Sequence, residues 1–315
     1  MKKHDVSFDS AGISLAAHLY VPEGAAGSRA IVVGHPGSGV KEQAAGLYAR
    51  LLAERGFVTL AFDAAYQGES GGVPRGLEDP AHRVEDFKAA VTYLGTRPEA
   101  DPDRIGALGI CASGGYVLNA AASDHRIRAV ATVSAADIAR QFRFGADGDQ
   151  DPAVFQGMLD AAAAARSGAG PQTFELFPEA LRTAGGHAGE GYDYYMTPRA
   201  QHPRSIKQMS WESVDRMAIF DSYAAIPLLT RPLLMIVGRR AVTSWMTVEA
   251  LGKATGPKRM SWIEGASHVD LYDKSEYVGP AVEQLTDFYA VLGRNGIGLS
   301  AGTTDQALAA SGSSN

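Results

Sequence analysis

Cysteine is almost absent from the sequence, which contains only Cys111 among its 315 residues. Disulfides within a chain need pairs of cysteines, so a fold built on a disulfide framework is excluded. The sequence also lacks any run of about 18 apolar residues, the length that a membrane-spanning helix requires. Its basic start, MKK, is followed by polar residues instead of the apolar core of a signal peptide. We therefore expect a soluble, cytoplasmic protein that does not associate with membranes.

An excess of positive charge is lacking as well. The chain has 29 Lys and Arg residues against 35 Asp and Glu residues, which gives a net charge of -6. The basic residues are scattered along the chain, so no surface for nucleic acid is expected. Hydrophobic residues make up 45% of the sequence, which is enough for the core of one large domain.

Short apolar runs alternate with helical patterns through most of the chain. After a hairpin expected at 3–22, the apolar runs predict strands and the segments between them predict helices. The predicted strands are 30–34, 57–62, 105–110, 128–134, 232–238 and 259–265, and the predicted helices are 41–55, 80–97, 114–123, 245–255 and 278–293. This alternation is typical of an α/β fold, with a mostly parallel central sheet covered by helices on both faces.

The interval 138–225 interrupts this alternation. It is rich in alanine, aromatic residues and turn formers, and we expect it to form a helical lid inserted over the strand ends. The predicted core is therefore made of residues 1–137 and 226–297. The small, polar residues of 298–315 predict a disordered tail.

The stretch 109-GICASGG-115 offers two candidate nucleophiles, Cys111 and Ser113, directly after a predicted strand. Ligands of parallel sheets bind at the carboxyl ends of the strands. A nucleophile on a tight strand-to-helix turn needs small residues two positions before and after it. Both candidates satisfy this spacing, but Cys111 places Gly109 on the incoming strand, whereas Ser113 would place the bulkier cysteine there. A third interpretation is a buried, unreactive cysteine in a tight turn.

This stretch resembles the G-x-C-x-[GS]-G-G motif of dienelactone-hydrolase-like members of the α/β-hydrolase superfamily, in which the cysteine is the nucleophile. The segments 35-HPGSGVKEQ-43 and 62-FDAAYQGESGG-72 extend the resemblance to a subgroup that includes the fungal fumagillin-type polyketide acyltransferases. The resemblance implies an α/β-hydrolase fold, and it favours Cys111 over Ser113. A helix N-terminus and an imidazolium can lower the pKa of a thiol, so we expect a thiolate at neutral pH.

The histidine partner is predicted at His268, in the phrase 264-EGASH-268 after the last predicted strand. Histidine follows the nucleophile and the acid along the chain of α/β-hydrolases. The acid is harder to place, because 238-GRRAVTS-244 has no carboxylate where these proteins usually carry one. We predict Asp137, after the preceding strand, as the acid. A cysteine–histidine dyad oriented by a weak or neutral group stays open, and Asp270 is disfavoured because it follows the histidine so closely.

The loop 35–43 is expected to donate one backbone N–H to an oxyanion hole. Gly37 or Ser38 supplies it in this interpretation, with Gly37 preferred, and Ala112 supplies the second N–H directly after the nucleophile. Asp63 lies in the segment 62–72, where the resembling proteins use an aspartate to brace loops, so a structural role is expected for it.

The lid carries a cluster of aromatic residues in 192-YDYYMTPRAQHPRS-205. We predict that Tyr192 and Tyr195 contact the substrate in a roomy, mainly apolar pocket. The nearby Arg199 and Arg204 are expected on the solvated surface. The sequence shows no spacing of His, Cys and Asp that indicates a metal site, and no cofactor is expected.

These features together predict an enzyme that attacks an acyl ester or thioester with Cys111, using His268 as the base. The acyl donor is expected as a small molecule, free or bound to a carrier protein, and a homo-oligomer is compatible with the sequence. Transfer of the acyl group to an alcohol or amine is the alternative to hydrolysis. A second alternative is a non-catalytic ligand-binding protein with the same fold.

Overall fold

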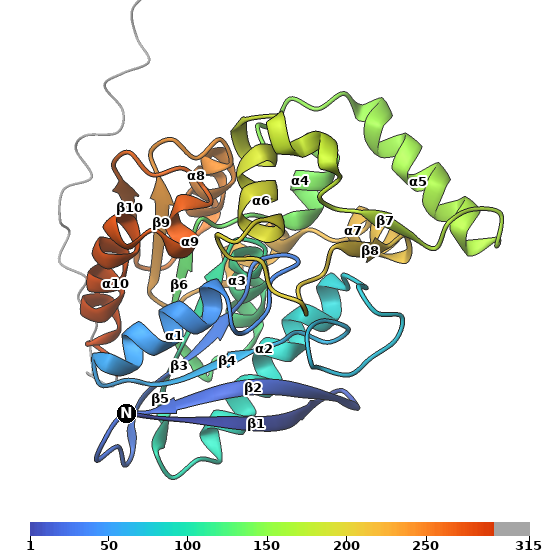
Figure 1. Cartoon of the computed structure of the whole chain (residues 1–315). Coiled ribbons are helices and arrows are strands. Elements are labelled where there is room, and N and C mark those ends of the chain that lie inside the picture. The colour runs from blue at the N-terminus through green and yellow to red at the C-terminus, as the bar shows by residue number, and fades with distance from the viewer. Residues whose placement is uncertain (293–315) are drawn as a thin grey trace, which may run out of the picture.

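The computed structural model describes residues 1–292, so the tail predicted for 298–315 lies outside the described residues. Eight strands form one sheet in the order β1-β2-β4-β3-β5-β6-β9-β10 (Figure 1). The strands are β1 (Lys2–Ser10), β2 (Ile13–Val21), β3 (Ser28–Gly34), β4 (Val58–Phe62), β5 (Ala100–Ile110), β6 (Ile127–Val133), β9 (Leu233–Gly238) and β10 (Lys258–Ile263). β2 pairs antiparallel with β1 and β4, and the pairs from β4 to β10 are all parallel. The predicted hairpin and mostly parallel sheet are confirmed.

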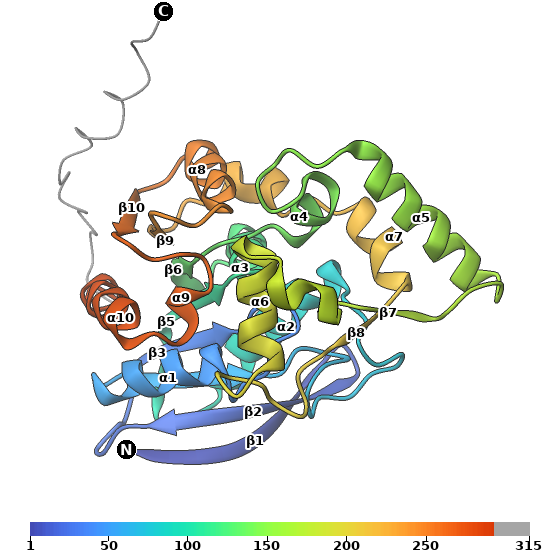
Figure 2. The same cartoon turned by 45° about the horizontal axis from the view of Figure 1, so that its top comes forward.

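Helices cover both faces of the sheet, as the alternating pattern predicts (Figure 2). They are α1 (Ala44–Glu54), α2 (Pro80–Gly95), α3 (Ser113–Ser123), α8 (Ser244–Lys253) and α10 (Ser275–Tyr289). α1 packs against α10, and α2 packs against α3. The strands β3, β4, β6 and β9 and the second half of β5, from Ile105 to Ile110, are almost entirely buried, because helices exclude water from both of their faces. Within residues 1–292, no helix combines the length and the apolar character that crossing a bilayer requires.

The segment between β6 and β9, where the sequence predicts the lid at 138–225, leaves the sheet and ends with a short helix that runs past residue 225. Its elements are α4 (Ile138–Phe144), α5 (Pro152–Arg166), β7 (Thr173–Glu175), η1 (Glu179–Thr183), α6 (Gly186–Met196), β8 (Gln208–Ser210), α7 (Glu212–Ala218) and η2 (Ser222–Leu228). The segment gathers over the carboxyl ends of the parallel strands (Figures 1 and 2), and we call it the lid. Most of these elements are helices, and β7 and β8 add a small antiparallel sheet.

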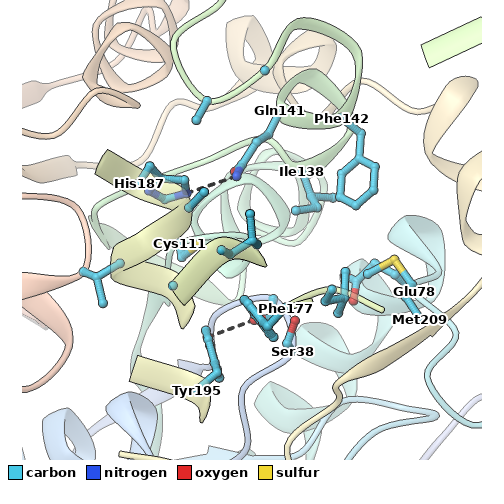
Figure 3. A pocket seen from close by; sticks show the side chains of 18 of the residues that line it. Ser38, Glu78, Cys111, Ile138, Gln141, Phe142, Phe177, His187, Tyr195 and Met209 are labelled. Atoms are coloured by element: carbon cyan, nitrogen blue, oxygen red, sulfur yellow. Dashed lines mark hydrogen bonds between the residues drawn. The ribbon is translucent and has the colours of Figure 1, made fainter. Parts of the chain in front are cut away.

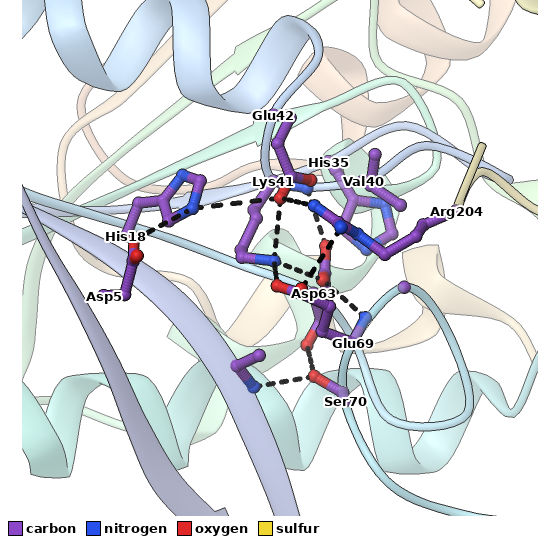
Figure 4. A network of polar contacts seen from close by, with 12 residues as sticks. Asp5, His18, His35, Val40, Lys41, Glu42, Asp63, Glu69, Ser70 and Arg204 are labelled. Carbon is purple, nitrogen blue, oxygen red and sulfur yellow. Dashed lines mark hydrogen bonds and ion pairs between the residues drawn. The ribbon is translucent and has the colours of Figure 1, made fainter. Parts of the chain in front are cut away.

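A buried ionic network joins the loops before α1 and after β4 (Figure 4). The ammonium group of Lys41 lies 2.8 Å from Asp63 and 2.5 Å from Glu69. The second carboxylate oxygen of Asp63 accepts the backbone N–H of Lys41 at 2.7 Å. Burial of a carboxylate is costly unless it is paired and hydrogen-bonded, and Asp63 is both. The predicted structural role of Asp63 is therefore confirmed. The sequence predicted that the first helix begins at residue 41, whereas α1 begins at Ala44.

Candidate active site

The turn after β5 holds Cys111 in a strained backbone conformation. Its φ of 54° lies in the left-handed region, which residues other than glycine adopt at a cost and which clusters at functional sites. A β-carbon added to Gly109 would lie 2.1 Å from the carbonyl oxygen of Ser113, so only glycine permits this close approach of strand and helix. The N–H of Cys111 donates to Val133 at 3.0 Å, and its carbonyl accepts from Gly114 at 2.7 Å. The sequence thus forms a sharp strand-to-helix elbow with Cys111 at its apex.

The two candidate nucleophiles point to different surroundings. Cys111 lines a cavity at the strand ends. Ser113 is buried in the first turn of α3, where its hydroxyl donates to the carbonyl of His35 at 2.6 Å and accepts from Arg83 at 3.2 Å. A buried hydroxyl that is held by two partners cannot approach a substrate in the cavity. The geometry therefore favours Cys111 over Ser113.

The predicted oxyanion groups lie side by side near the sulfur. A β-carbon on Gly37 would be 3.6 Å from the β-carbon of Ala112, which shows how closely the two backbones approach. Hydrogen bonds from the N–H groups of Ala112 and Gly37 act on Cys111 in the direction that lowers its pKa. The hydroxyl of Tyr195 donates to the carbonyl of Gly37 at 2.9 Å. This bond ties the loop of Gly37 to α6 of the lid.

Burial decides the charge of the cysteine. It raises the pKa of Cys111, while hydrogen bonds from the Tyr272 hydroxyl and from the N–H groups of Ala112 and Gly37 oppose that rise without overcoming it. Desolvation disfavours the charged form of any thiol. This direction is opposite to the one expected from the sequence and favours the neutral thiol.

The predicted base, His268, is buried in the loop between β10 and the short helix α9 (Asp270–Asp273). Its Nδ1 lies 2.5 Å from the hydroxyl oxygen of Thr243, and its Nε2 lies 2.9 Å from the hydroxyl of Tyr272. Burial, with the nearby His187, lowers the pKa of His268 well below its ordinary value. The imidazole is therefore neutral in the resting state and is able to accept a proton.

The group that orients His268 is a threonine and not a carboxylate. Thr243 follows β9 and directly precedes α8, which is the position where the acid was sought in the sequence. The prediction of Asp137 as the acid is corrected. Its two carboxylate oxygens accept the backbone N–H groups of Arg140 at 3.1 Å and Ser222 at 2.9 Å, which caps α4 and anchors η2. Sequence reasoning missed Thr243 because it searched 238–244 for a charge rather than for a hydroxyl.

Asp270 is also occupied elsewhere. Its carboxylate accepts the N–H of Ser267 at 3.0 Å and pairs with Lys274 at 2.6 Å. Ser267 in turn accepts the N–H of Asp270 at 3.3 Å, so the pair forms a reciprocal cap at the start of α9. In the part of the chain that the structure describes, neither ring nitrogen of His268 contacts a carboxylate. The imidazole of His268 is thus held between two neutral hydroxyls, those of Thr243 and Tyr272.

The cavity in front of Cys111 lies between the strand ends and the lid, and it encloses about 390 Å³. Its wall is largely apolar and includes Ile138, Phe142, Leu176, Phe177, Leu181 and Met209. Figure 3 shows Cys111 among the lining side chains, between Tyr195 and the pair formed by His187 and Gln141. That pair is joined at 3.2 Å. Such a cavity suits an acyl chain with few polar groups.

The two tyrosines predicted to bind substrate differ in position. Tyr195 lines the cavity, where its ring stacks on Phe177 with a centroid distance of 4.7 Å. Tyr192 is not among the lining residues, and its hydroxyl contacts Glu179 within the lid. The prediction for Tyr192 is therefore corrected, because its hydroxyl is bound to Glu179 within the lid and not to the cavity.

Arg199 and Arg204, the two lid residues expected on the solvated surface, are held in ion pairs. Arg199 lies 2.7 Å from Asp273, and Arg204 lies 2.5 Å from Glu42. Neither needs a ligand to balance its charge. Within residues 1–292, no group of three or more His, Cys, Asp or Glu side chains is arranged to hold a metal ion.

Comparisons with known proteins agree with this architecture. The family model described as "Dienelactone hydrolase family" matches residues 15–138, which contain Gly37, Cys111 and Ala112. The uncharacterized protein YcjY of Escherichia coli K12 is 41% identical over 302 residues, and the match covers 92% of this chain and 99% of YcjY. The crystal structure of hypothetical protein PA2218 from Pseudomonas aeruginosa has a TM-score of 0.85 at 36% identity, and covers 92% of this chain and 94% of that one.

A shorter match is to a relative whose name states an activity. The thiohydrolase aneE of Aspergillus aculeatus is 37% identical over 122 residues, which cover 39% of this chain and 38% of that protein. The sheet order, the elbow after β5 and the full-length relatives lead to one conclusion. The chain belongs to the dienelactone hydrolase family and has the α/β-hydrolase fold.

Proposed function

We propose that the protein hydrolyses an acyl thioester or ester through a covalent acyl-enzyme on Cys111. The observation that carries this proposal is the position of the sulfur. It lies at the apex of a strained elbow, faces the cavity and is surrounded by the N–H groups of Gly37 and Ala112. A buried, inert cysteine has no need of an adjacent pair of backbone donors or of a histidine held between two hydroxyls.

The chemistry follows from this arrangement. The thiol transfers its proton toward His268, the proposed base, as the sulfur attacks the acyl carbon. The carbonyl oxygen becomes an oxyanion and accepts hydrogen bonds from the N–H groups of Gly37 and Ala112, which are already in place and need no reorganisation. The proton then returns to the leaving group. In the second half of the reaction His268 takes a proton from water, the water oxygen attacks the thioester, and Cys111 is released.

The neutral partner of His268 favours thioesters over alkyl esters. A carboxylate would stabilise the imidazolium that forms during the reaction, whereas Thr243 offers only a dipole. An alkoxide is a strong base and must be protonated as it leaves. A thiolate, with an ordinary pKa of about 8.5, leaves with much less assistance. The name of the relative aneE, a thiohydrolase, supports the same substrate class.

Acyl transfer is the second candidate, and the cavity favours it. Its apolar wall and its cover of lid residues restrict the access of water to the acyl-enzyme. An alcohol or amine with an apolar body would then compete well for the acyl group. The acyl donor in this case is a thioester, free or attached to a carrier protein.

The proposal is tested by incubating the protein with a panel of acyl thioesters and aryl esters, followed by intact-protein mass spectrometry. We expect an acyl adduct on the wild type and on Ser113→Ala, and no adduct on Cys111→Ala. Adding an alcohol or amine to the acylated protein separates hydrolysis from transfer by the product that forms. An adduct that survives in Cys111→Ala and disappears in Ser113→Ala would overturn the assignment. No adduct with any substrate would favour a ligand-binding protein.

A further inference from the structure

Two of the polar side chains that line the cavity in front of Cys111 have no part in the proposed mechanism. They are Ser38, which directly follows Gly37, and Glu78, which lies in the loop between β4 and α2. Only 6% of Ser38 and 1% of Glu78 is exposed, and Figure 3 shows both among the residues around the cavity. The few polar groups in a largely apolar cavity are the ones that fix the orientation and the identity of a ligand.

The hydroxyl of Ser38 is available to a ligand. Within residues 1–292, no protein group forms a hydrogen bond with this hydroxyl, although the backbone carbonyl of Ser38 accepts the N–H of Ile206 from the lid at 2.9 Å. The φ of Ser38 is 66°, in the left-handed region that glycine adopts without strain. Strained residues of this kind cluster at functional sites. The loop thus holds a hydroxyl in the cavity that is free both to donate and to accept.

The carboxylate of Glu78 has one acceptor position left. Its Oε1 accepts the hydroxyl of Tyr116 at 2.7 Å and lies 3.4 Å from Nε of Arg83. Its Oε2 accepts the side-chain amide of Gln67 at 2.6 Å. A carboxylate offers about four lone-pair sites, so the second lone pair of Oε2 has no donor in the part of the chain that the structure describes. A ligand group that donates a hydrogen bond would complete this set.

The charges around Glu78 select a neutral donor. Arg83 already balances the carboxylate, so a bound ammonium group would leave an unpaired positive charge in a buried site, which is costly. A keto oxygen only accepts hydrogen bonds and would face the lone pairs of Glu78. A hydroxyl group donates and accepts, and therefore matches a carboxylate that lacks a donor and a serine that is able to supply either role.

We propose that Ser38 and Glu78 form a specificity subsite that binds a hydroxyl group on the acyl chain of the substrate. This inference rests on the proposed acyl-enzyme function and narrows its substrate class to hydroxyacyl thioesters. The leaving group has to reach His268 to be protonated, whereas Ser38 belongs to the loop that holds the acyl carbonyl through Gly37. Neighbouring Cα atoms are about 3.8 Å apart, so the hydroxyl is expected within a few carbons of the acyl carbon.

The test uses hexanoyl thioesters of one thiol, either unsubstituted or with a hydroxyl on the third, fourth or fifth carbon, and the matching ketone of the preferred position. The value of kcat/KM is measured for the wild type, Ser38→Ala, Glu78→Gln and Ser205→Ala. Ser205 is the matched control, because it has the same exposed fraction of 6% and its hydroxyl donates to the carbonyl of His202 outside the cavity. Each preference is a ratio of two substrates on one protein, so a partly unfolded variant does not alter it.

We expect the wild type to prefer one hydroxyhexanoyl thioester over the unsubstituted one by at least about tenfold, because hydrogen bonds to charged groups are the stronger ones. Ser38→Ala should reduce this preference about fivefold, the effect of one hydrogen bond between neutral groups. Glu78→Gln should remove most of it, and Ser205→Ala should keep it. The ketone should react no better than the unsubstituted thioester. A wild type without a preference for any hydroxyl position, or a preference that Ser38→Ala or Glu78→Gln leaves unchanged, would overturn the subsite.

Failure of the proposed function looks different. Titration calorimetry measures the binding of the same thioesters to Cys111→Ala, in which no acyl-enzyme forms on the sulfur. If the wild type forms no acyl adduct, while Cys111→Ala binds the hydroxyacyl thioester more tightly than the unsubstituted one, the subsite is supported and the acyl-enzyme is wrong. If the wild type is acylated and neither assay distinguishes the substrates, the acyl-enzyme is supported and the subsite is wrong.

Discussion

The substitution Thr243→Val tests the neutral group that contacts His268, the proposed base. Valine replaces the hydroxyl by a methyl group at nearly constant volume. The change removes the 2.5 Å hydrogen bond to Nδ1 of His268. Both side chains are buried, so no water replaces the lost partner. Leaving a buried donor unsatisfied costs about 1–3 kcal/mol.

The imidazole can avoid this penalty by moving its proton from Nδ1 to Nε2. The Nε2 lone pair then disappears, and with it the acceptor for the proton of Cys111. We take the free energy of the lost hydrogen bond as the free-energy preference for the tautomer that is protonated on Nδ1. A loss of about 1–3 kcal/mol then lowers the acylation rate roughly 5- to 150-fold. Thr243→Ser keeps the hydroxyl and should retain most of the activity.

Single-turnover acylation by an aryl thioester measures this fall, and urea unfolding measures the stability change. Thr247→Val is the matched control. Thr247 is buried one turn later in α8, and its hydroxyl makes only a 3.5 Å contact with the carbonyl of Ala135. If Thr243→Val acylates as fast as Thr247→Val, Thr243 does not orient the base, and the reasoning is wrong.

Two further predictions concern the lid and the effect of acid. Tyr195→Phe removes the hydrogen bond to Gly37 and should lower the acylation rate about fivefold, since one hydrogen bond is worth about 1 kcal/mol. Tyr192→Phe should leave the rate unchanged, and equal rates for the two variants would contradict the assigned contact. Burial lowers the pKa of His35, His187 and His268, so below pH 6.5 the unfolded chain binds protons that the folded chain does not. Their contribution to stability is present above pH 6.5 and is lost as the pH falls toward the folded pKa values, by up to about 1.4 kcal/mol per pH unit for each histidine. A urea midpoint that stays constant between pH 7.5 and pH 5.5 would argue against this effect.

Local patterns in the sequence were sufficient for the fold. The alternation of apolar runs and helical segments depends on residues close in the chain, and it predicted the strands and helices of the core to within a few residues. The elbow was predictable for the same reason, since Gly109 and Cys111 are two residues apart and their steric needs are local. The place of His268 after the last strand followed from the order of these elements.

The contacts of the site could not be predicted in this way. Thr243 and His268 are separated by 25 residues, and 134 residues separate Ser134 from the carbonyl of His268 that it binds. Asp137 had the right chemistry for an acid, but the backbone N–H groups at two helix starts hold its carboxylate. A sequence lists the groups that are able to form a hydrogen bond without showing which of them face one another.

The sequence by itself determined the order of the strands and helices, the elbow with its single cysteine and the position of the histidine along the chain. The tertiary structure decided which hydroxyls contact His268 and which tyrosine of the lid bonds to the loop of Gly37. It also decided that burial favours the neutral forms of the Cys111 thiol and the His268 imidazole. The physical reason is that secondary structure and tight turns depend on near neighbours. Side-chain pairing and protonation depend on burial, and burial is set by packing between segments far apart in the chain.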